Sequence, residues 1–123
     1  LNTPDNIDLS PQLMNITMRR GDIKQSHTLT RKTVNVGRGS TNDINLGDDP
    51  NVSQQHGVII WRKNNMWYSN RNKDATTKIN GKKIRGLKLV KLEPVTEIEI
   101  GPTLLVFHSN AQQDVSDFIK TNL

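Results

Sequence analysis

Two neighbouring stretches carry most of the information in this 123-residue chain: Val36-Gly37-Arg38-Gly39-Ser40-Thr41-Asn42-Asp43-Ile44 and Val52-Ser53-Gln54-Gln55-His56-Gly57. The first begins as a β-branched, alternating segment and reaches a glycine, which permits a tight backbone turn. Arg38 follows in a predicted loop. A guanidinium group binds phosphate through two parallel hydrogen bonds, and the Ser53 hydroxyl supplies a neutral donor. These residues therefore predict a socket for a single phosphate group.

Around these stretches the chain consists of short segments in which apolar and polar residues alternate. β-Branched residues are plentiful and helical spacing is absent, so the segments are predicted to be strands. Gly, Asn and Asp separate them about every eight to twelve residues, which is typical of an antiparallel β-sandwich. The expected strands are 14–18, 28–30, 33–36, 43–46, 57–62, 66–69, 77–80, 88–92, 97–100 and 104–107.

The two ends differ from this pattern. Residues 1–13 are polar and contain Pro4 and Pro11, which predicts a tail or linker. Residues 14–109 form the predicted sandwich domain. Residues 110–123 are expected to form a short helix with an apolar stripe, packed on the sandwich or binding a partner. The chain lacks a starting Met and a secretory signal, so it is interpreted as a fragment or a processed product.

The composition excludes several classes of function. The absence of cysteine excludes disulfides, thiolate chemistry and cysteine-ligated zinc, and it fits a reducing compartment, either cytoplasm or nucleus. The three histidines lack metal-ligand spacing, and no apolar run is long enough to span a bilayer. No metal or cofactor is therefore expected. The formal net charge of +5 is a weak indication of anionic partners.

An ordered set of motifs gives the chain a family resemblance. The set is Gly37-Arg38, Asn42-Asp43-Ile44, Ser53-x-x-His56, Trp67, Thr77-Lys78-Ile79-Asn80-Gly81-Lys82-Lys83-Ile84 and Ile98-x-Ile100-Gly101. In this order and approximate spacing it resembles the forkhead-associated (FHA) domain family over about residues 14–108. The resemblance implies an eleven-stranded β-sandwich with binding loops at one end. It also implies a reader of phosphothreonine peptides without catalytic activity, acting on a partner protein or on a segment of its own parent chain.

The resemblance also assigns roles to residues. Arg38 and Ser53 would bind the phosphate, and the loops would be supported by Gly37, His56, Asn80 and Gly81. The imidazole of His56 would tie loops together without touching the ligand. Asn80-Gly81 independently favours a type I′ hairpin turn. The residues expected to contact the peptide are Asn51, Gln54, Asp74, Ala75 and Thr76.

Two positions depart from the family pattern. Ala75-Thr76 stands where members usually have Asn-Gly, whose asparagine holds the peptide backbone, and Gln54 stands where many members have a basic residue. Asp74, Thr76 and Asn72 are the candidates to replace the asparagine. These departures leave an alternative open, in which the domain is a structural or oligomerisation module that lacks phosphate-dependent binding.

Two other functions have weaker support in the sequence. Ser53 and His56 have neither a G-x-S-x-G context nor an orienting carboxylate, so a hydrolase is not expected. The basic cluster of Lys82, Lys83, Arg85, Lys88 and Lys91 lacks interleaved aromatic residues, so a solvated face is favoured over a nucleic-acid surface. Nucleic-acid binding by this face is a third, weaker hypothesis. Such a face can still steer acidic or phosphorylated partners by long-range attraction.

Overall fold

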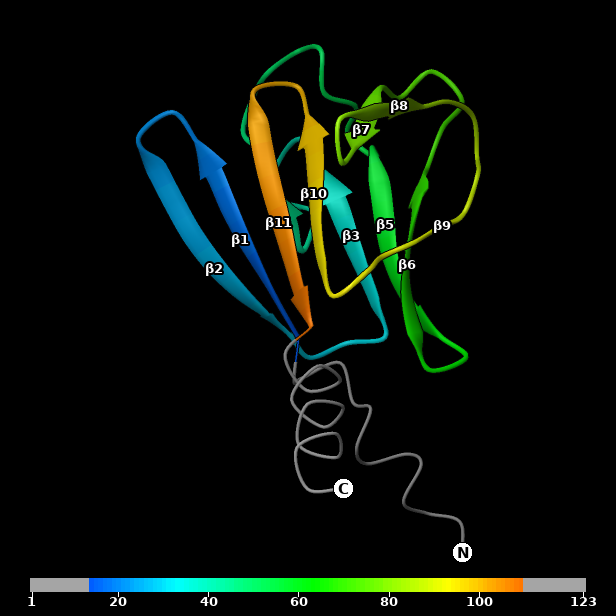
Figure 1. Cartoon of the computed structure of the whole chain (residues 1–123). Coiled ribbons are helices and arrows are strands. Elements are labelled where there is room, and N and C mark those ends of the chain that lie inside the picture. Colours follow the sequence, from blue (N-terminus) through cyan, green and yellow to red (C-terminus); the bar gives the residue numbers. More distant parts are fainter. Residues whose placement is uncertain (1–13, 110–123) are drawn as a thin grey trace, which may run out of the picture.

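The structure is a computed structural model that describes residues 14–109, so the predicted tail at 1–13 and helix at 110–123 lie outside the described residues. Within this range the fold is a β-sandwich of eleven strands in two sheets, without a helix, as Figure 1 shows. The predicted all-β sandwich is therefore confirmed.

The first sheet has six strands in the order β2-β1-β11-β10-β7-β8. These are β1 (Met14–Arg20), β2 (Ile23–Leu29), β7 (Thr77–Ile79), β8 (Lys82–Ile84), β10 (Val95–Ile100) and β11 (Thr103–Ser109). The second sheet has five strands in the order β4-β3-β5-β6-β9. These are β3 (Thr33–Gly37), β4 (Ile44–Asn45), β5 (Gly57–Arg62), β6 (Asn65–Asn70) and β9 (Val90–Lys91). Strands β3 and β4 pair in parallel, while β3 and β5 are antiparallel.

The core lies between the sheets and follows from the alternation of the sequence. In β1, β10 and β11 every second residue is buried, because successive side chains in a strand point to opposite faces. Tyr68 and Phe107 are the largest fully buried side chains, and aliphatic residues fill the space around them. A chain with few aromatic residues thus builds its core mainly from Ile, Leu, Val and Met.

The sequence pattern missed most of the two edge strands of the larger sheet. Strand β2 begins at Ile23, although only its last residues were expected to be extended, and β8 was not expected as a separate strand. Most side chains of β2 are exposed, so burial does not impose an alternating apolar pattern on its sequence. An edge strand of this kind is defined by its partner, here β1, to which β2 is paired along its whole length.

Three connections gather at one end of the sandwich, which we call the loop end (Figure 1). They are residues 38–43 after β3, residues 46–56 between β4 and β5, and residues 71–76 between β6 and β7. The start of β1 and the end of β11 lie at the opposite end, where Met14 pairs with Ser109. Residues 14–109 contain no helix with the length and apolar character to cross a membrane.

Candidate functional site

Gly37 ends β3 at a point where another loop passes very close. A Cβ atom added at this position would lie 2.2 Å from the carbonyl oxygen of Gln54 and 2.9 Å from Oδ1 of Asn42. Glycine is therefore required by the close approach of the β4–β5 loop rather than by a positive φ angle. This approach brings the residue after Gly37 next to Ser53.

Arg38 and Ser53 are neighbours through their backbones. The Arg38 N–H donates to the carbonyl of Ser53 at 3.0 Å, and Nε of the Arg38 side chain donates to the carbonyl of Val52 at 2.9 Å. Both residues are partly exposed. Arg38 makes no ion pair within the described residues, in which Arg31–Asp43 is the ion pair present. The backbone thus holds the guanidinium beside Ser53 through Nε, and no carboxylate of residues 14–109 neutralises it.

Asn42 holds the two loops together, a role that the sequence analysis did not assign. Its Nδ2 lies within hydrogen-bonding distance of three carbonyl oxygens, those of Arg38 at 3.1 Å, Gly39 at 3.2 Å and Gln54 at 3.0 Å. Asn45 adds a second brace, because its Oδ1 accepts from the N–H groups of Gly39 and Gly47. The only sign of this role in the sequence is that Asn42 belongs to the Asn42-Asp43-Ile44 motif.

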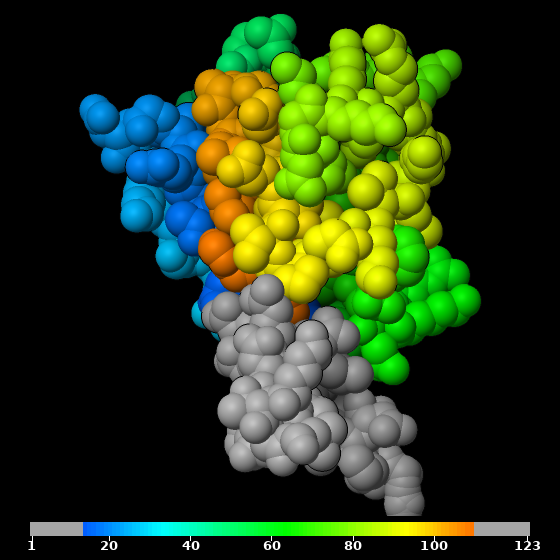
Figure 2. Space-filling model, viewed as in Figure 1, coloured from blue at the N-terminus to red at the C-terminus, as the bar shows by residue number. Residues whose placement is uncertain are grey.

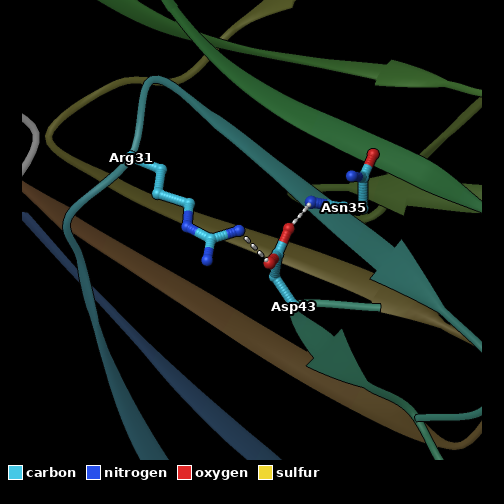
Figure 3. A network of polar contacts seen from close by, with 3 residues as sticks. All are labelled: Arg31, Asn35 and Asp43. Carbon is cyan, nitrogen blue, oxygen red and sulfur yellow. Dashed lines mark hydrogen bonds and ion pairs between the residues drawn. The ribbon is translucent and has the colours of Figure 1, made fainter. Parts of the chain in front are cut away.

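Asp43 anchors the far side of the same loop. One carboxylate oxygen accepts from the backbone N–H of Asn35 at 2.8 Å, and the other pairs with Nη1 of Arg31 at 3.0 Å (Figure 3). The Asn35 N–H belongs to β3, so the loop is tied back to the strand from which it departs. The Arg31 side chain is 71% exposed, and such a surface pair contributes at most about 1 kcal/mol.

His56 joins the β4–β5 loop to the β6–β7 loop. Its side chain is 1% exposed; Nδ1 accepts from the Ser53 N–H at 3.1 Å, and Nε2 lies 3.0 Å from the Thr76 carbonyl. Because a carbonyl only accepts, Nε2 carries the proton and the ring is neutral. Burial lowers the pKa of His56, and the hydrogen bond to Thr76 opposes that effect. The buried ring therefore fixes Ser53 and Thr76 relative to each other.

The residues expected to contact a peptide lie in the β4–β5 and β6–β7 loops, and most of them are exposed. Asn51, Gln54, Asp74 and Thr76 are exposed. Asn51 and Thr76 also line a hollow of about 400 Å³ together with Lys78, Glu99 and Gly101. Ala75 differs, because it is 4% exposed and its methyl group belongs to the interior. A peptide contact at Ala75 would therefore have to come from its backbone.

Asn72, a candidate to hold the peptide backbone, has its side-chain amide engaged within the domain. Its Nδ2 donates to the carbonyl of Gln55 at 3.2 Å, and its Oδ1 accepts from the Asp74 N–H at 3.0 Å. Nδ2 thus joins the β6–β7 loop to the β4–β5 loop, and Oδ1 shapes the β6–β7 loop itself. Asp74 and Thr76 stay the exposed candidates for holding a peptide backbone.

A buried polar network supports the β6–β7 loop from below. Oδ1 of Asn70 accepts from the hydroxyls of Thr77 at 2.8 Å and Tyr68 at 3.2 Å, and Nδ2 points to the carbonyls of Ala75 and Gly86. Burial raises the pKa of Tyr68 to about 12, so its hydroxyl stays a donor. Gly57 makes room for it, since a Cβ there would lie 2.0 Å from the Tyr68 hydroxyl.

Asn80 and Gly81 form the two-residue turn between β7 and β8. Their φ angles are 50° and 82°, as a type I′ turn requires. The backbone N–H of Asn80 donates to the carbonyl of Glu97, and the Asn80 side chain accepts from the Glu97 N–H at 2.9 Å. The turn is thereby fixed to β10, and it holds the hairpin whose first strand continues from the β6–β7 loop.

The comparisons with known proteins agree with this architecture. The FHA domain family matches residues 34–101, more than half of the chain, and the chain belongs to that family. The matched range contains Arg38, Ser53, His56 and the Asn80-Gly81 turn. A search of curated proteins gives no significant match.

Several solved structures share the fold. The N-terminal FHA domain of Rad53p from S. cerevisiae, in complex with a phosphothreonine peptide, is 21% identical, with 90% of this chain and 99% of that chain covered and a TM-score of 0.71. An engineered FHA domain with a Myc-pTBD peptide is 18% identical, with 86% and 99% covered and a TM-score of 0.70. The FHA domain of the CT664 protein from Chlamydia trachomatis is 23% identical, with 77% and 95% covered and a TM-score of 0.66.

Proposed function

We propose that this domain binds phosphothreonine-containing peptides, on a partner protein or on its own parent chain, and makes or breaks no covalent bond. Arg38 contacts the phosphate through its guanidinium and Ser53 through its hydroxyl. The observation that carries the proposal is the juxtaposition of these two residues by the Arg38–Ser53 backbone bond and the Nε–Val52 bond. Two of the structural relatives are complexes with a phosphothreonine peptide or a Myc-pTBD peptide, which supports the assignment.

The state of Arg38 is compatible with an anionic ligand. Within residues 14–109 Arg38 has no ion pair, so no carboxylate of these residues competes for its guanidinium. A phosphothreonine carries about −1.5 to −2 charges near neutral pH, so it supplies the missing counter-charge. The peptide chain on either side would lie over Asn51, Gln54, Asp74 and Thr76.

The test is titration calorimetry with a degenerate library of phosphothreonine peptides and its unphosphorylated counterpart. We expect Arg38→Ala to weaken phosphopeptide binding about 30- to 100-fold, because a charge-assisted, forked contact is lost. Ser53→Ala should weaken it about three- to tenfold, since one neutral hydrogen bond is removed.

Arg62→Ala is the matched control, because it removes the same charge from the β5–β6 hairpin at the opposite end and should leave binding unchanged. Equal affinity for phosphorylated and unphosphorylated peptides would contradict the proposal. A stable oligomer whose formation is indifferent to Arg38 would point to the structural module instead.

A further inference from the structure

A second hollow, of about 200 Å³, lies between the β6–β7 loop and the end of the β7–β8 hairpin. One wall is the loop itself, and the other is β8 with the residues that follow it. The lining residues are Lys73, Asp74, Ala75, Thr76, Lys83, Ile84 and Arg85. In the space-filling view the β7–β8 hairpin and the following segment stand at one edge of the larger sheet, on the loop-end side (Figure 2).

Both walls of this hollow are held by one buried side chain. Nδ2 of Asn70 lies 3.4 Å from the carbonyl of Ala75 in the first wall and 3.2 Å from the carbonyl of Gly86, next to Arg85, in the second. Asn70 is 2% exposed, and the hydroxyls of Thr77 and Tyr68 bind its Oδ1. The backbone of both walls is thus held in place from within the domain, so a ligand would need to order only the exposed side chains of the hollow.

The charges lining the hollow are unbalanced. Lys73, Lys83 and Arg85 come from the two walls and face a single acid, Asp74. Within the part of the chain that the structure describes, none of these four residues forms an ion pair. Like charges held together without counter-ions repel one another, and a bound anion relieves that repulsion.

We propose that this hollow binds a second acidic group of the same phosphothreonine peptide, either a further phosphate or a cluster of carboxylates. This inference rests on the proposed function, because it deepens the specificity of that site. Thr76 connects the two places: its carbonyl accepts from His56, which also holds the Ser53 N–H, and Thr76 itself lines the second hollow. The preferred target therefore carries two acidic features at a fixed spacing.

The experiment measures fluorescence anisotropy with peptides that contain one phosphothreonine. An Asp-Asp-Asp triplet or a second phosphothreonine is placed at successive positions on either side of it, and triple-serine peptides are the reference. We expect one placement to bind about three- to tenfold more tightly than its reference, and the gain to shrink at high salt. Comparing the two series distinguishes carboxylate from phosphate.

Lys83→Ala/Arg85→Ala should remove this gain while leaving affinity for the triple-serine peptides unchanged. Lys82→Ala/Lys88→Ala removes the same charge from neighbouring residues that do not line the hollow, and it should keep the gain. The inference is overturned if no placement improves binding, or if both double variants reduce the gain equally.

A second measurement separates this inference from the proposed function. Inorganic phosphate and tri-aspartate are titrated into the ¹⁵N-labelled Arg38→Ala domain, and amide shifts are followed. Saturable shifts at residues 83–86 that disappear in Lys83→Ala/Arg85→Ala would support the second site even if phosphopeptide binding at Arg38 failed. Their absence with both probes would overturn it even if Arg38-dependent binding were confirmed.

Discussion

At the residue scale, His56 shows how one buried side chain can join two loops. The ring accepts from the Ser53 N–H and donates to the Thr76 carbonyl, so it bridges two of the three connections at the loop end. Only the neutral imidazole can do both, because a protonated Nδ1 would meet the Ser53 N–H as a second donor. The protonation state of His56 is therefore coupled to the shape of the site.

This coupling predicts that acid destabilises the domain. The pKa of folded His56 lies below its ordinary value of 6.5, so the unfolded chain takes up a proton more readily. The stabilisation is complete above about pH 6.5 and is lost as the pH falls toward the folded pKa. Urea unfolding at pH 7.5, 6.5 and 5.5, with an NMR titration of the ring, measures both quantities.

His27→Gln and His108→Gln are the controls, and both variants should keep the loss of stability in acid. The explanation fails if the His56 ring titrates at or above pH 6.5 in the folded domain.

Part of the candidate site could be predicted from the sequence and part could not. The predictable residues are those whose expected roles follow from their own side chains and motif spacing, namely Gly37, Arg38, Ser53 and His56. The Val52 carbonyl that holds Nε of Arg38 has no sequence signature, since every residue has a carbonyl. Asn42 was visible in a motif, but its three acceptors are backbone atoms of two loops that only the fold brings together.

At the scale of elements, two hairpin turns of the same type use different residues. The β7–β8 turn has Asn80-Gly81, the favoured type I′ pair, whereas the β5–β6 turn places Lys63 and Asn64 at φ angles of 52° and 63°. A positive φ is unfavourable for a lysine, and asparagine tolerates it better. The second turn therefore carries strain that a substitution can remove.

We expect Lys63→Asn/Asn64→Gly to stabilise the domain by about 0.5–1 kcal/mol, because it installs the favoured pair where the backbone already has the required shape. Thermal unfolding measures the gain. Phosphopeptide affinity should not change, since this turn lies at the end opposite the loops (Figure 1). Swapping the other turn to Asn80→Lys/Gly81→Asn should destabilise, and a destabilised Lys63→Asn/Asn64→Gly domain would contradict the argument.

The strands themselves were predictable where they are buried on one face. In β1 the buried residues Met14, Ile16 and Met18 are the apolar ones of an alternating sequence. In β10 the buried Ile98 and Ile100 alternate in the same way with the exposed Glu97 and Glu99. Strand β8 was missed because two of its three residues are exposed lysines, and β2 was mostly missed because few of its side chains are buried. An alternating apolar pattern arises only where one face of a strand is buried, and these edge strands bury few of their side chains.

At the scale of the whole molecule, backbone hydrogen bonds tie the connections of the loop end to one another and to the sheets. Backbone bonds join Arg38 to Ser53, Arg71 to His56 and Asn80 to Glu97, with lengths of 3.0, 2.9 and 2.8 Å. Two packed sheets with a continuous core stand beneath these loops. The loops are thus held in place by bonds within the domain itself.

This rigidity predicts that peptide binding is a local event. Amide shifts caused by a phosphothreonine peptide should concentrate in residues 38–56 and 71–76, while the Met14–Ser109 pair and the β5–β6 turn should be silent. Hydrogen exchange in β1 and β11 should be unchanged. The unphosphorylated peptide is the control, and shifts spread across both sheets would show instead that the sandwich repacks.

The pairing of Met14 with Ser109 has a practical consequence. The start of β1 and the end of β11 lie side by side, at the end of the sandwich opposite the loop end (Figure 1). A host protein, fluorophore or sensor surface attached next to Met14 and Ser109 would therefore lie at the end of the sandwich opposite the proposed phosphate site. Because Met14 and Ser109 lie on adjacent paired strands, residues 14–109 can be inserted into another protein at two attachment points that are one strand spacing apart, about 5 Å.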